Sequence, residues 1–267
     1  MTAVLIAEVK KRLADRQIML FAGSGVSANI GLPSWGGLID KMADDIGFDP
    51  KLFRTLGEFP ALAEYYEIEK HGRDDLVKWM QDEWHKPGLT SMSSNVHDLI
   101  VKCDFPRIYT TNYDHWLERS YTERGIKANP IIDVQDLPNL SSDGGKIIKF
   151  HGDLDRPETM VLTETDYANR MALESELDIQ LRADLFRFGT IFIGYSLSDR
   201  NLRYILHKLT QIRNKGGKLT VGERSYLLTH RVNKVEMRLL QQWGIDVIVS
   251  DELYPSDALE AFLKDVV

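Results

Sequence analysis

Seven short, mostly apolar segments alternate with longer amphipathic segments along this chain, and no other feature constrains its fold as strongly. Strands that are buried on both faces of a parallel sheet have this composition. The predicted strands cover residues 18–22, 107–111, 131–134, 146–150, 190–194, 225–229 and 246–249. The predicted helices cover residues 2–15, 35–46, 60–70, 74–84, 95–103, 113–123, 175–188, 198–213, 232–243 and 256–266. This alternation predicts an α/β fold with a doubly wound, mostly parallel, Rossmann-like sheet.

Two regions interrupt the alternation. Residues 36–105 contain helix after helix without a convincing strand, and residues 154–188 contain a loop followed by a helix. We interpret both regions as insertions that form a small helical subdomain beside the sheet, within a single domain that spans residues 1–267. Open α/β sheets bind ligands at the carboxyl ends of their strands. A cleft between that edge and the helical subdomain is therefore the expected site.

The composition excludes several classes of protein. The 267 residues include 33 Lys and Arg against 40 Asp and Glu, a net charge of −7, so the basic footprint of a nucleic-acid-binding protein is missing. The single cysteine, Cys103, excludes an internal disulfide framework and a zinc site of several cysteines, and it favours a reducing cytoplasm. No apolar run approaches the length of a membrane span. We expect a cytoplasmic protein that binds neither nucleic acid nor membrane directly.

A glycine-containing segment follows the first predicted strand directly. It consists of Ala22, Gly23, Ser24, Gly25, Val26 and Ser27. Glycines let the backbone approach an anion closely, and free N–H groups near the start of a helix attract negative charge. The segment therefore predicts a phosphate-binding loop. A tight turn without a ligand would have the same composition, and the third glycine of the dinucleotide fingerprint is absent.

Three further segments also follow predicted strands. They are Thr110-Thr111-Asn112-Tyr113-Asp114, Phe150-His151-Gly152-Asp153, and Gly194-Tyr195-Ser196-Leu197-Ser198-Asp199. Because the carboxyl ends of parallel strands meet at one edge of a sheet, we expect all four segments to line one crevice. This convergence is the main indication of a functional site.

Two side chains in these segments suit acid–base or hydrogen-bonding chemistry. His151 can act as a general base near neutral pH, or it can be a histidine satisfied by backbone at a strand end. Asn112 can cap the following helix, or it can hydrogen-bond to a ribose or a water. Asp114 favours the start of that helix electrostatically. The serines lack the Gly-x-Ser-x-Gly context of a hydrolase nucleophile, and we propose no serine nucleophile.

Taken together and in this order, the four segments resemble the motifs of the sirtuin family. The glycine segment resembles the nucleotide-binding loop, and Gly31-Leu32-Pro33 resembles the element that follows it. The segment around Asn112 resembles the asparagine motif, and His151-Gly152 resembles the catalytic histidine motif. Gly194-Tyr195-Ser196 resembles the late loop that contacts the cofactor. The resemblance covers roughly residues 18–250, nearly the whole chain.

Two departures from the sirtuin pattern narrow the function that the resemblance implies. Deacylase sirtuins carry a zinc module of four cysteines between the histidine and the late loop, whereas no cysteine lies between His151 and Gly194. Ser34-Trp35-Gly36 stands where many sirtuins have Asp-Phe-Arg, which shapes the nicotinamide pocket. The pattern is more similar to bacterial sirtuin-like domains of antiphage defence, which lack the zinc module and hydrolyse NAD.

The resemblance implies a role for each site residue. Backbone N–H groups of Gly23, Ser24, Gly25 and Val26, after Ala22, would bind the NAD pyrophosphate, and Gly194 and Ser196 would contact the adenosine side. Asn112 would orient the ribose and the attacking water, His151 would be the general base, and Asp114 would support the Asn112 loop. No metal is required.

Other functions remain open at this point. A protein deacylase or ADP-ribosyltransferase would need a peptide or an acceptor protein, and a non-catalytic subunit would bind NAD or ADP-ribose without turnover. The resemblance also implies a separate regulatory partner, such as a HerA-like ATPase or an Argonaute-type protein, because an unrestrained NAD hydrolase would poison its own cell. A homo-oligomer is the expected assembly.

Overall fold

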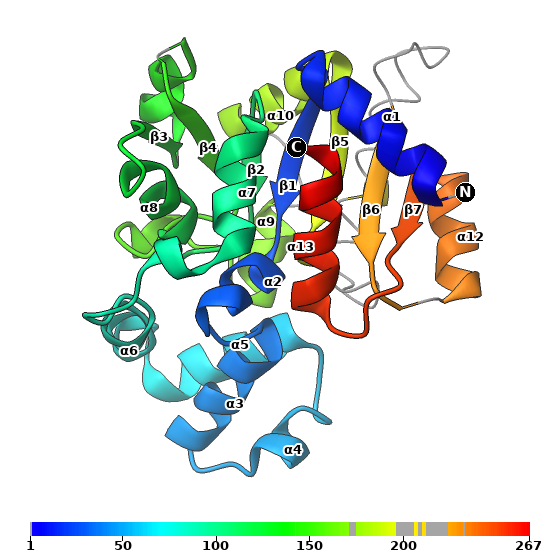
Figure 1. Ribbon diagram of the computed structural model, residues 1–267. Coiled ribbons are helices and arrows are strands. Elements are labelled where there is room, and N and C mark those ends of the chain that lie inside the picture. The colour runs from blue at the N-terminus through cyan, green and yellow to red at the C-terminus, as the bar shows by residue number, and fades with distance from the viewer. Residues whose placement is uncertain are drawn as a thin grey trace.

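A parallel sheet forms the centre of the molecule (Figure 1). The computed structural model describes residues 2–141, 143–170, 175–195, 206–207, 210–211, 224–231 and 233–267. Within them, seven strands pair in the order β3-β4-β2-β1-β5-β6-β7, and every pairing is parallel. The strands are β1 (Ile18–Ala22), β2 (Ile108–Thr110), β3 (Ala128–Ile131), β4 (Gly145–Lys149), β5 (Gly189–Ile193), β6 (Ser225–Thr229) and β7 (Ile245–Val249). The doubly wound parallel sheet predicted from the sequence is confirmed.

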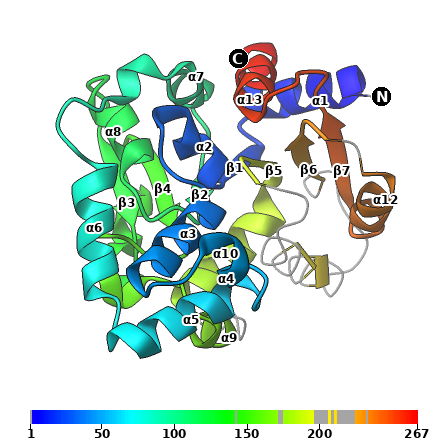
Figure 2. The same cartoon turned by 90° about the horizontal axis from the view of Figure 1, so that it is seen from below.

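Buried side chains on both faces of the sheet explain why its strands are mostly apolar. In β1, Leu20 packs into one cluster of buried side chains and Phe21 into another, because successive side chains of a strand point to opposite faces. The first face is covered by α1 (Thr2–Ala14), α7 (Asn95–Cys103), α8 (Trp116–Thr122) and α13 (Pro255–Val266). The second face is covered by α10 (Glu176–Arg187) and α12 (Lys234–Gln242), so the sheet is enclosed on both sides (Figure 2).

A third cluster of buried side chains lies beyond the carboxyl ends of the strands (Figure 1). It is built by α3 (Trp35–Asp45), α4 (Pro50–Phe53), α5 (Phe59–Lys70) and α6 (Asp74–Trp84). The short helix α9 (Glu164–Arg170) contacts α5. The helices of the two predicted insertions therefore do not all lie in one place. Helices α7 and α10 pack on the sheet, whereas α3 to α6 form this helical subdomain.

Several element boundaries differ from the sequence-based expectation. Strand β3 lies three residues earlier than predicted and contains Pro130, which an edge strand tolerates. Residues 134–141 form a 3₁₀ helix instead. Helix α8 begins at Trp116 rather than at residue 113, because the Asp114 carboxylate accepts a hydrogen bond from the Trp116 N–H and residues 111–115 form a loop. The short helices α2 (Ser24–Ser27), α4 and α9 were not predicted.

Two further predictions concern helices. The helix expected at residues 198–213 falls almost entirely outside the described residues. None of the described helices combines the length and the apolar character that crossing a membrane requires.

Candidate active site

The four predicted segments leave the sheet side by side and at one level. Ala22 of β1 pairs with Thr110 of β2 and with Ile193 of β5, and Thr110 in turn pairs with Lys149 of β4. Asn112 and His151 each stand two residues beyond the paired Thr110 and Lys149, so they occupy equivalent positions on neighbouring strands. The sheet therefore brings together the segments that follow β1, β2, β4 and β5, at the edge seen in Figure 2.

Three glycines allow the loops after β1 and β5 to touch. A Cβ atom on Gly23 would lie 2.7 Å from the Gly194 carbonyl oxygen, and one on Gly25 would lie 2.8 Å from the Gly194 Cα. Gly194 itself has a φ of +73°, a conformation that glycine adopts without strain. The chain order changes direction between β1 and β5, and α/β proteins bind ligands at such a switch point.

The glycine loop uses most of its own N–H groups internally. The Gly23 N–H donates to the Ile193 carbonyl at 2.9 Å, the Gly25 N–H to the Gly194 carbonyl at 2.9 Å, and the Val26 N–H to the Gly23 carbonyl at 3.0 Å. The Ser24 N–H, at the first position of α2, has no acceptor among the described residues. Three of the four N–H groups predicted to bind pyrophosphate are therefore already hydrogen-bonded within the protein. Among the described residues, the Ser24 N–H has no such acceptor.

The Asn112 side chain is held by the glycine loop. Asn112 is 6% exposed, and its Nδ2 donates to the Gly23 carbonyl at 3.2 Å and to the Ser27 Oγ at 3.0 Å. Its backbone N–H donates to Thr110 Oγ1 at 3.0 Å. No described residue hydrogen-bonds to its Oδ1. The amide is thus fixed through its nitrogen, and its oxygen is left to accept a hydrogen bond from a ligand.

Asp114 anchors the Ser27 side chain that holds the Asn112 amide. Its Oδ2 accepts a hydrogen bond from Ser27 Oγ at 2.8 Å, and its Oδ1 accepts one from the Trp116 N–H at 3.0 Å. Both oxygens are therefore engaged within the protein. Ser27, the last residue of the glycine segment, links Asp114 to Asn112.

His151 lies in aromatic surroundings. It is 4% exposed, its ring is close to parallel with that of Phe150, and the edge of Tyr167 meets it with ring centroids 5.3 Å apart. Neither ring nitrogen bonds to a described residue. Burial, with a smaller contribution from the positive charge of Arg170, lowers the pKa of His151 from 6.5 to about 3. The imidazole is therefore neutral at physiological pH, and its unprotonated nitrogen can accept a hydrogen bond. The same burial makes it a weaker base than an exposed histidine.

Helix α9 supplies two neighbours of His151 that the sequence analysis missed. Tyr167 and Arg170 are three residues apart and share a face of the helix. The Arg170 guanidinium lies 4.1 Å from the Phe150 ring centroid and donates to Ser175 Oγ at 2.8 Å. The reciprocal hydrogen bonds between Thr163 and Asp166 form a capping box, and their spacing in the sequence is the signal that would have revealed this helix.

The loop after β5 is described as far as Tyr195. The Tyr195 hydroxyl donates to the Ala22 carbonyl at 3.1 Å and lies 3.0 Å from Thr111 Oγ1, so it joins three of the four segments. Ser196, predicted to contact the adenosine side of NAD, lies outside the described residues.

In the described part of the chain, one group of side chains has the spacing of metal ligands. His115, Asp153 and Asp155 place donor atoms within 4.8 Å of one another. The Asp153 Oδ1, however, already lies 2.9 Å from His115 Nε2, and its Oδ2 lies 3.1 Å from the Lys149 ammonium. The Lys149 ammonium therefore occupies, beside Asp153, the place of a positive charge that a metal ion would otherwise provide.

A parallel doubly wound sheet with a glycine loop at its switch point is typical of nucleotide-binding α/β proteins. The model of the SIR2-like domain family matches residues 106–248, which is more than half of the 267 residues. The chain therefore belongs to the SIR2-like family, and the resemblance to sirtuins predicted from the four motifs is confirmed.

Similar proteins include bacterial NAD(+) hydrolases and a defence-associated sirtuin. The chain is 28% identical over 262 residues to the NAD(+) hydrolase ThsA of Cytobacillus dafuensis, covering 98% of this chain and 50% of that protein. It is 31% identical over 212 residues to the NAD(+) hydrolase ThsA of Enterococcus faecium, covering 76% of this chain and 42% of that protein. Defense-associated sirtuin 2 of Bacillus subtilis is 24% identical over 213 residues. The chain spans about half or less of the length of these relatives.

A solved structure has the same fold. The structure described as "Structural Basis for the Mechanism and Regulation of Sir2 Enzymes" superposes with a TM-score of 0.50 and covers 98% of this chain and 97% of its own. The sequence identity is 12%, so this likeness concerns the fold alone.

Proposed function

We propose that this chain hydrolyses NAD to nicotinamide and ADP-ribose, as part of a bacterial defence against phage. The relatives named NAD(+) hydrolase and defence-associated sirtuin support the proposal. The observation that carries it is the equivalent placement of Asn112 and His151 on β2 and β4, beside the glycine loop of β1.

The reaction breaks the bond between the nicotinamide nitrogen and C1′ of the ribose. Nicotinamide leaves as a neutral molecule with the bonding electron pair, and positive charge develops at C1′. A water oxygen then bonds to C1′, and the proton that this water loses is the proton the site must accept. Catalysis of this kind requires the substrate and the water to be held in place before the bond breaks.

Each role falls to a residue whose surroundings suit it. The Ser24 N–H would bind the pyrophosphate, next to the point where Gly194 meets the glycine loop. The free Oδ1 of Asn112 would orient a ribose hydroxyl or the attacking water. The neutral His151 imidazole would accept the proton. Asp114 would hold the Asn112 loop through Ser27, and Ser196 would contact the adenosine side.

The proposal extends to the setting of the enzyme. It would act in the cytoplasm without a metal, as a homo-oligomer, and a separate partner such as a HerA-like ATPase or an Argonaute-type protein would restrain it. The chain would work as one domain over residues 1–267.

Chromatography of the products tests the proposal. Purified protein is incubated with NAD, with and without an acetylated peptide, and nicotinamide and ADP-ribose are quantified. We expect release without peptide in the wild type, and no release in His151→Ala or Asn112→Ala variants that keep the wild-type circular dichroism spectrum. Release that requires the peptide would indicate a deacylase. Binding of NAD without any product would indicate a non-catalytic subunit.

A further inference from the structure

A fully buried ammonium lies beside the candidate site and has no role in the mechanism above. Lys149, the last residue of β4, is 0% exposed. Its Nζ donates to the Tyr113 carbonyl at 3.1 Å and to the Asp114 carbonyl. The same Nζ lies 3.1 Å from Asp153 Oδ2 and 3.3 Å from Glu118 Oε1. A buried ammonium is tolerated only when it is paired in this way.

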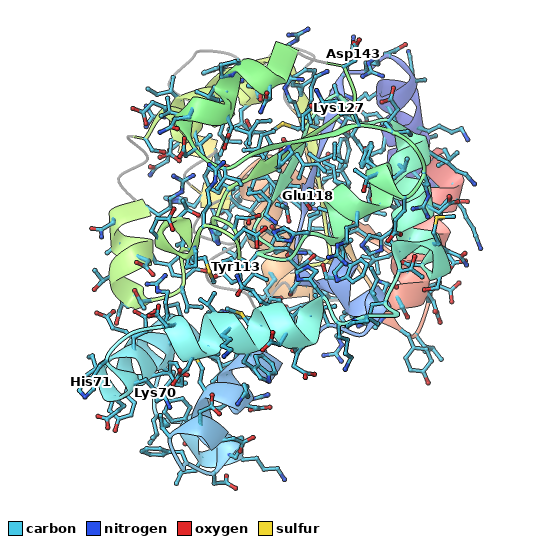
Figure 3. All side chains as sticks on the ribbon, turned by 90° about the vertical axis from the view of Figure 1, so that its left-hand side faces the viewer. Lys70, His71, Tyr113, Glu118, Lys127 and Asp143 are labelled. Carbon is cyan, nitrogen blue, oxygen red and sulfur yellow. The ribbon has the colours of Figure 1, made fainter. Side chains whose placement is uncertain are left out.

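The partners of this ammonium belong to the loops of both candidate catalytic residues. Tyr113 and Asp114 directly follow Asn112, whereas Lys149 and Asp153 stand two residues before and after His151. Tyr113 and Glu118 lie over the middle of the molecule in Figure 3, between Lys127 at one end and His71 at the other. One charged group thus joins the segment after β2 to the segment after β4.

The charges in the cluster keep Lys149 protonated. Burial alone would lower the pKa of Lys149, but the carboxylates of Glu118 and Asp153 outweigh burial and raise that pKa above its usual value. Asp153 has a second partner in His115, whose Nε2 lies 2.9 Å from its Oδ1. The ammonium therefore donates to the two carbonyls as a fixed cation, with the carboxylates of Glu118 and Asp153 close to it.

The carbonyls that Lys149 holds belong to the two residues that directly follow Asn112. The peptide units of Tyr113 and Asp114 are anchored to Lys149, while the Asn112 amide reaches back to Gly23 and Ser27. A buried apolar residue at the end of β4 would avoid the cost of dehydrating an ammonium, so the charge is not needed for packing.

We propose that Lys149 is a positioning residue, which fixes the backbone after Asn112 and so holds the Asn112 amide in register with His151. The proposal rests on the proposed NAD hydrolysis for its kinetic readout, and on the position of the Asn112 side chain for its structural readout.

The kinetic test compares variants that separate the carbonyl contacts from the charge balance. Lys149→Met in a Glu118→Gln background removes the ammonium and one counter-charge together, whereas Glu118→Gln alone leaves Lys149 bound to Asp153 and to both carbonyls. The matched control is Lys146→Met, since Lys146 lies in the same strand, is half-buried and makes no ion pair with a described residue.

We expect Glu118→Gln and Lys146→Met to keep most of the wild-type kcat. The double variant should lose roughly 100-fold in kcat while its KM for NAD stays close to that of Glu118→Gln, because a misplaced catalytic group costs turnover rather than binding. Its melting temperature should fall, because the Asp153 carboxylate and the two carbonyls lose a buried donor. A double variant with the kcat of Glu118→Gln would overturn the proposal, since Lys149 would then only fill space.

Crystal structures of the wild type and the double variant separate this proposal from the proposed function. If the wild type releases no nicotinamide, the NAD hydrolase proposal fails. The position of the Asn112 side chain in the two crystal structures then tests the role of Lys149. Loss of the Asn112 contacts to Gly23 and Ser27 in the double variant supports positioning, and an unmoved amide refutes it. Should the double variant not fold, Lys149→Gln in the Glu118→Gln background replaces the ammonium with a shorter, neutral donor. A lowered kcat with a displaced Asn112 amide supports positioning by the ammonium, and the kcat of Glu118→Gln with an unmoved amide shows that the ammonium is not required.

Discussion

Asn112 and His151 occupy equivalent positions on neighbouring strands, but their surroundings are opposite in character. The Asn112 amide is tied by hydrogen bonds to Gly23 and Ser27. The His151 ring lies against Phe150 and Tyr167 and bonds to none of the described residues.

The difference indicates how each side chain is prepared for the role that we propose for it. Hydrogen bonds fix the direction in which Asn112 presents its free oxygen, before any ligand arrives. Burial instead fixes the protonation state of His151, because an apolar environment disfavours the charged imidazolium. Substitutions at Asn112 should therefore disturb both stability and activity, whereas substitutions at His151 that preserve its shape should disturb activity alone.

Asn112→Asp should have the largest effect. The carboxylate has the shape of the amide but cannot donate to the Gly23 carbonyl or to Ser27, and it adds a buried negative charge close to Asp114. We expect turnover to fall at least 100-fold, and the free energy of unfolding to fall by about 3 kcal/mol or more, because the loss of a donor also buries an unpaired charge. Urea denaturation and the nicotinamide assay measure the two effects. Wild-type stability in this variant would show that the hydrogen bonds do not hold the loop.

His151→Phe should remove activity and leave stability nearly intact. A phenyl ring suits the contacts with Phe150 and Tyr167 but has no nitrogen to accept a proton. We expect kcat to fall by about 10²- to 10⁴-fold, the usual contribution of a general base. The free energy of unfolding should change by less than about 1.5 kcal/mol, as for other volume-conserving swaps. His71→Ala is the control, because His71 is exposed at the far end of α5 (Figure 3). Residual turnover close to wild type would remove His151 from the mechanism.

Gly194→Ala tests the close approach of the glycine loop. Its Cβ would lie 2.8 Å from the Gly23 carbonyl oxygen, in addition to the strain of a φ of +73°. The matched control is Gly47→Ala, because Gly47 has a φ of +75° and open space around its Cβ position. Strain alone should cost Gly47→Ala about 1 kcal/mol, and overpacking should cost Gly194→Ala about 2 kcal/mol more. NAD affinity, measured by calorimetry, should fall in Gly194→Ala only. Equal losses of stability in both variants would contradict the contact between the two loops.

The parts of this site that follow from short stretches of sequence could be predicted, and the parts made by distant contacts could not. Buried strands and the small or polar residues after them are local patterns, and they predicted the sheet and the four segments at its edge. Lys149 reads in the sequence as an ordinary polar strand residue, because its partner Glu118 is remote in the chain. Helix α9 lacks apolar periodicity, and its contacts with Glu64 and Arg73 come from α5 and from the start of α6. The N–H groups of Gly23 and Gly25 donate to carbonyls at the end of β5 and just after it. These contacts join segments that are far apart in the sequence, so no local pattern reveals them.

Ser27→Ala should have an intermediate effect on the Asn112 side of the comparison. The substitution leaves the buried Asp114 Oδ2 without its hydroxyl donor and removes one acceptor from Asn112 Nδ2. We expect stability to fall by about 1–3 kcal/mol and kcat to fall roughly tenfold as the amide loosens. Ser120→Ala is the control, since Ser120 is also buried but donates only to the Leu117 carbonyl of its own helix. Equal kinetics in the two variants would mean that the link from Asp114 to Asn112 has no part in turnover.

The pH dependence of stability tests the surroundings of His151, and its effect is absent at neutral pH and appears only in acid. The pKa of His151 is lowered to about 3 in the folded protein, against an ordinary value of 6.5. Between these two values the unfolded chain binds more protons at this residue than the folded chain does, so stability rises with pH. The contribution is fully present above pH 6.5 and is lost progressively as the pH falls towards 3. His85 and His97, whose pKa values are lowered to about 4, add slopes of the same sign. The slope of unfolding free energy against pH should therefore be shallower in His151→Phe than in the wild type over this window, and parallel above pH 7. Identical slopes in the two proteins would mean that His151 is solvated, and the inference that burial keeps it neutral before the reaction would fail with that result.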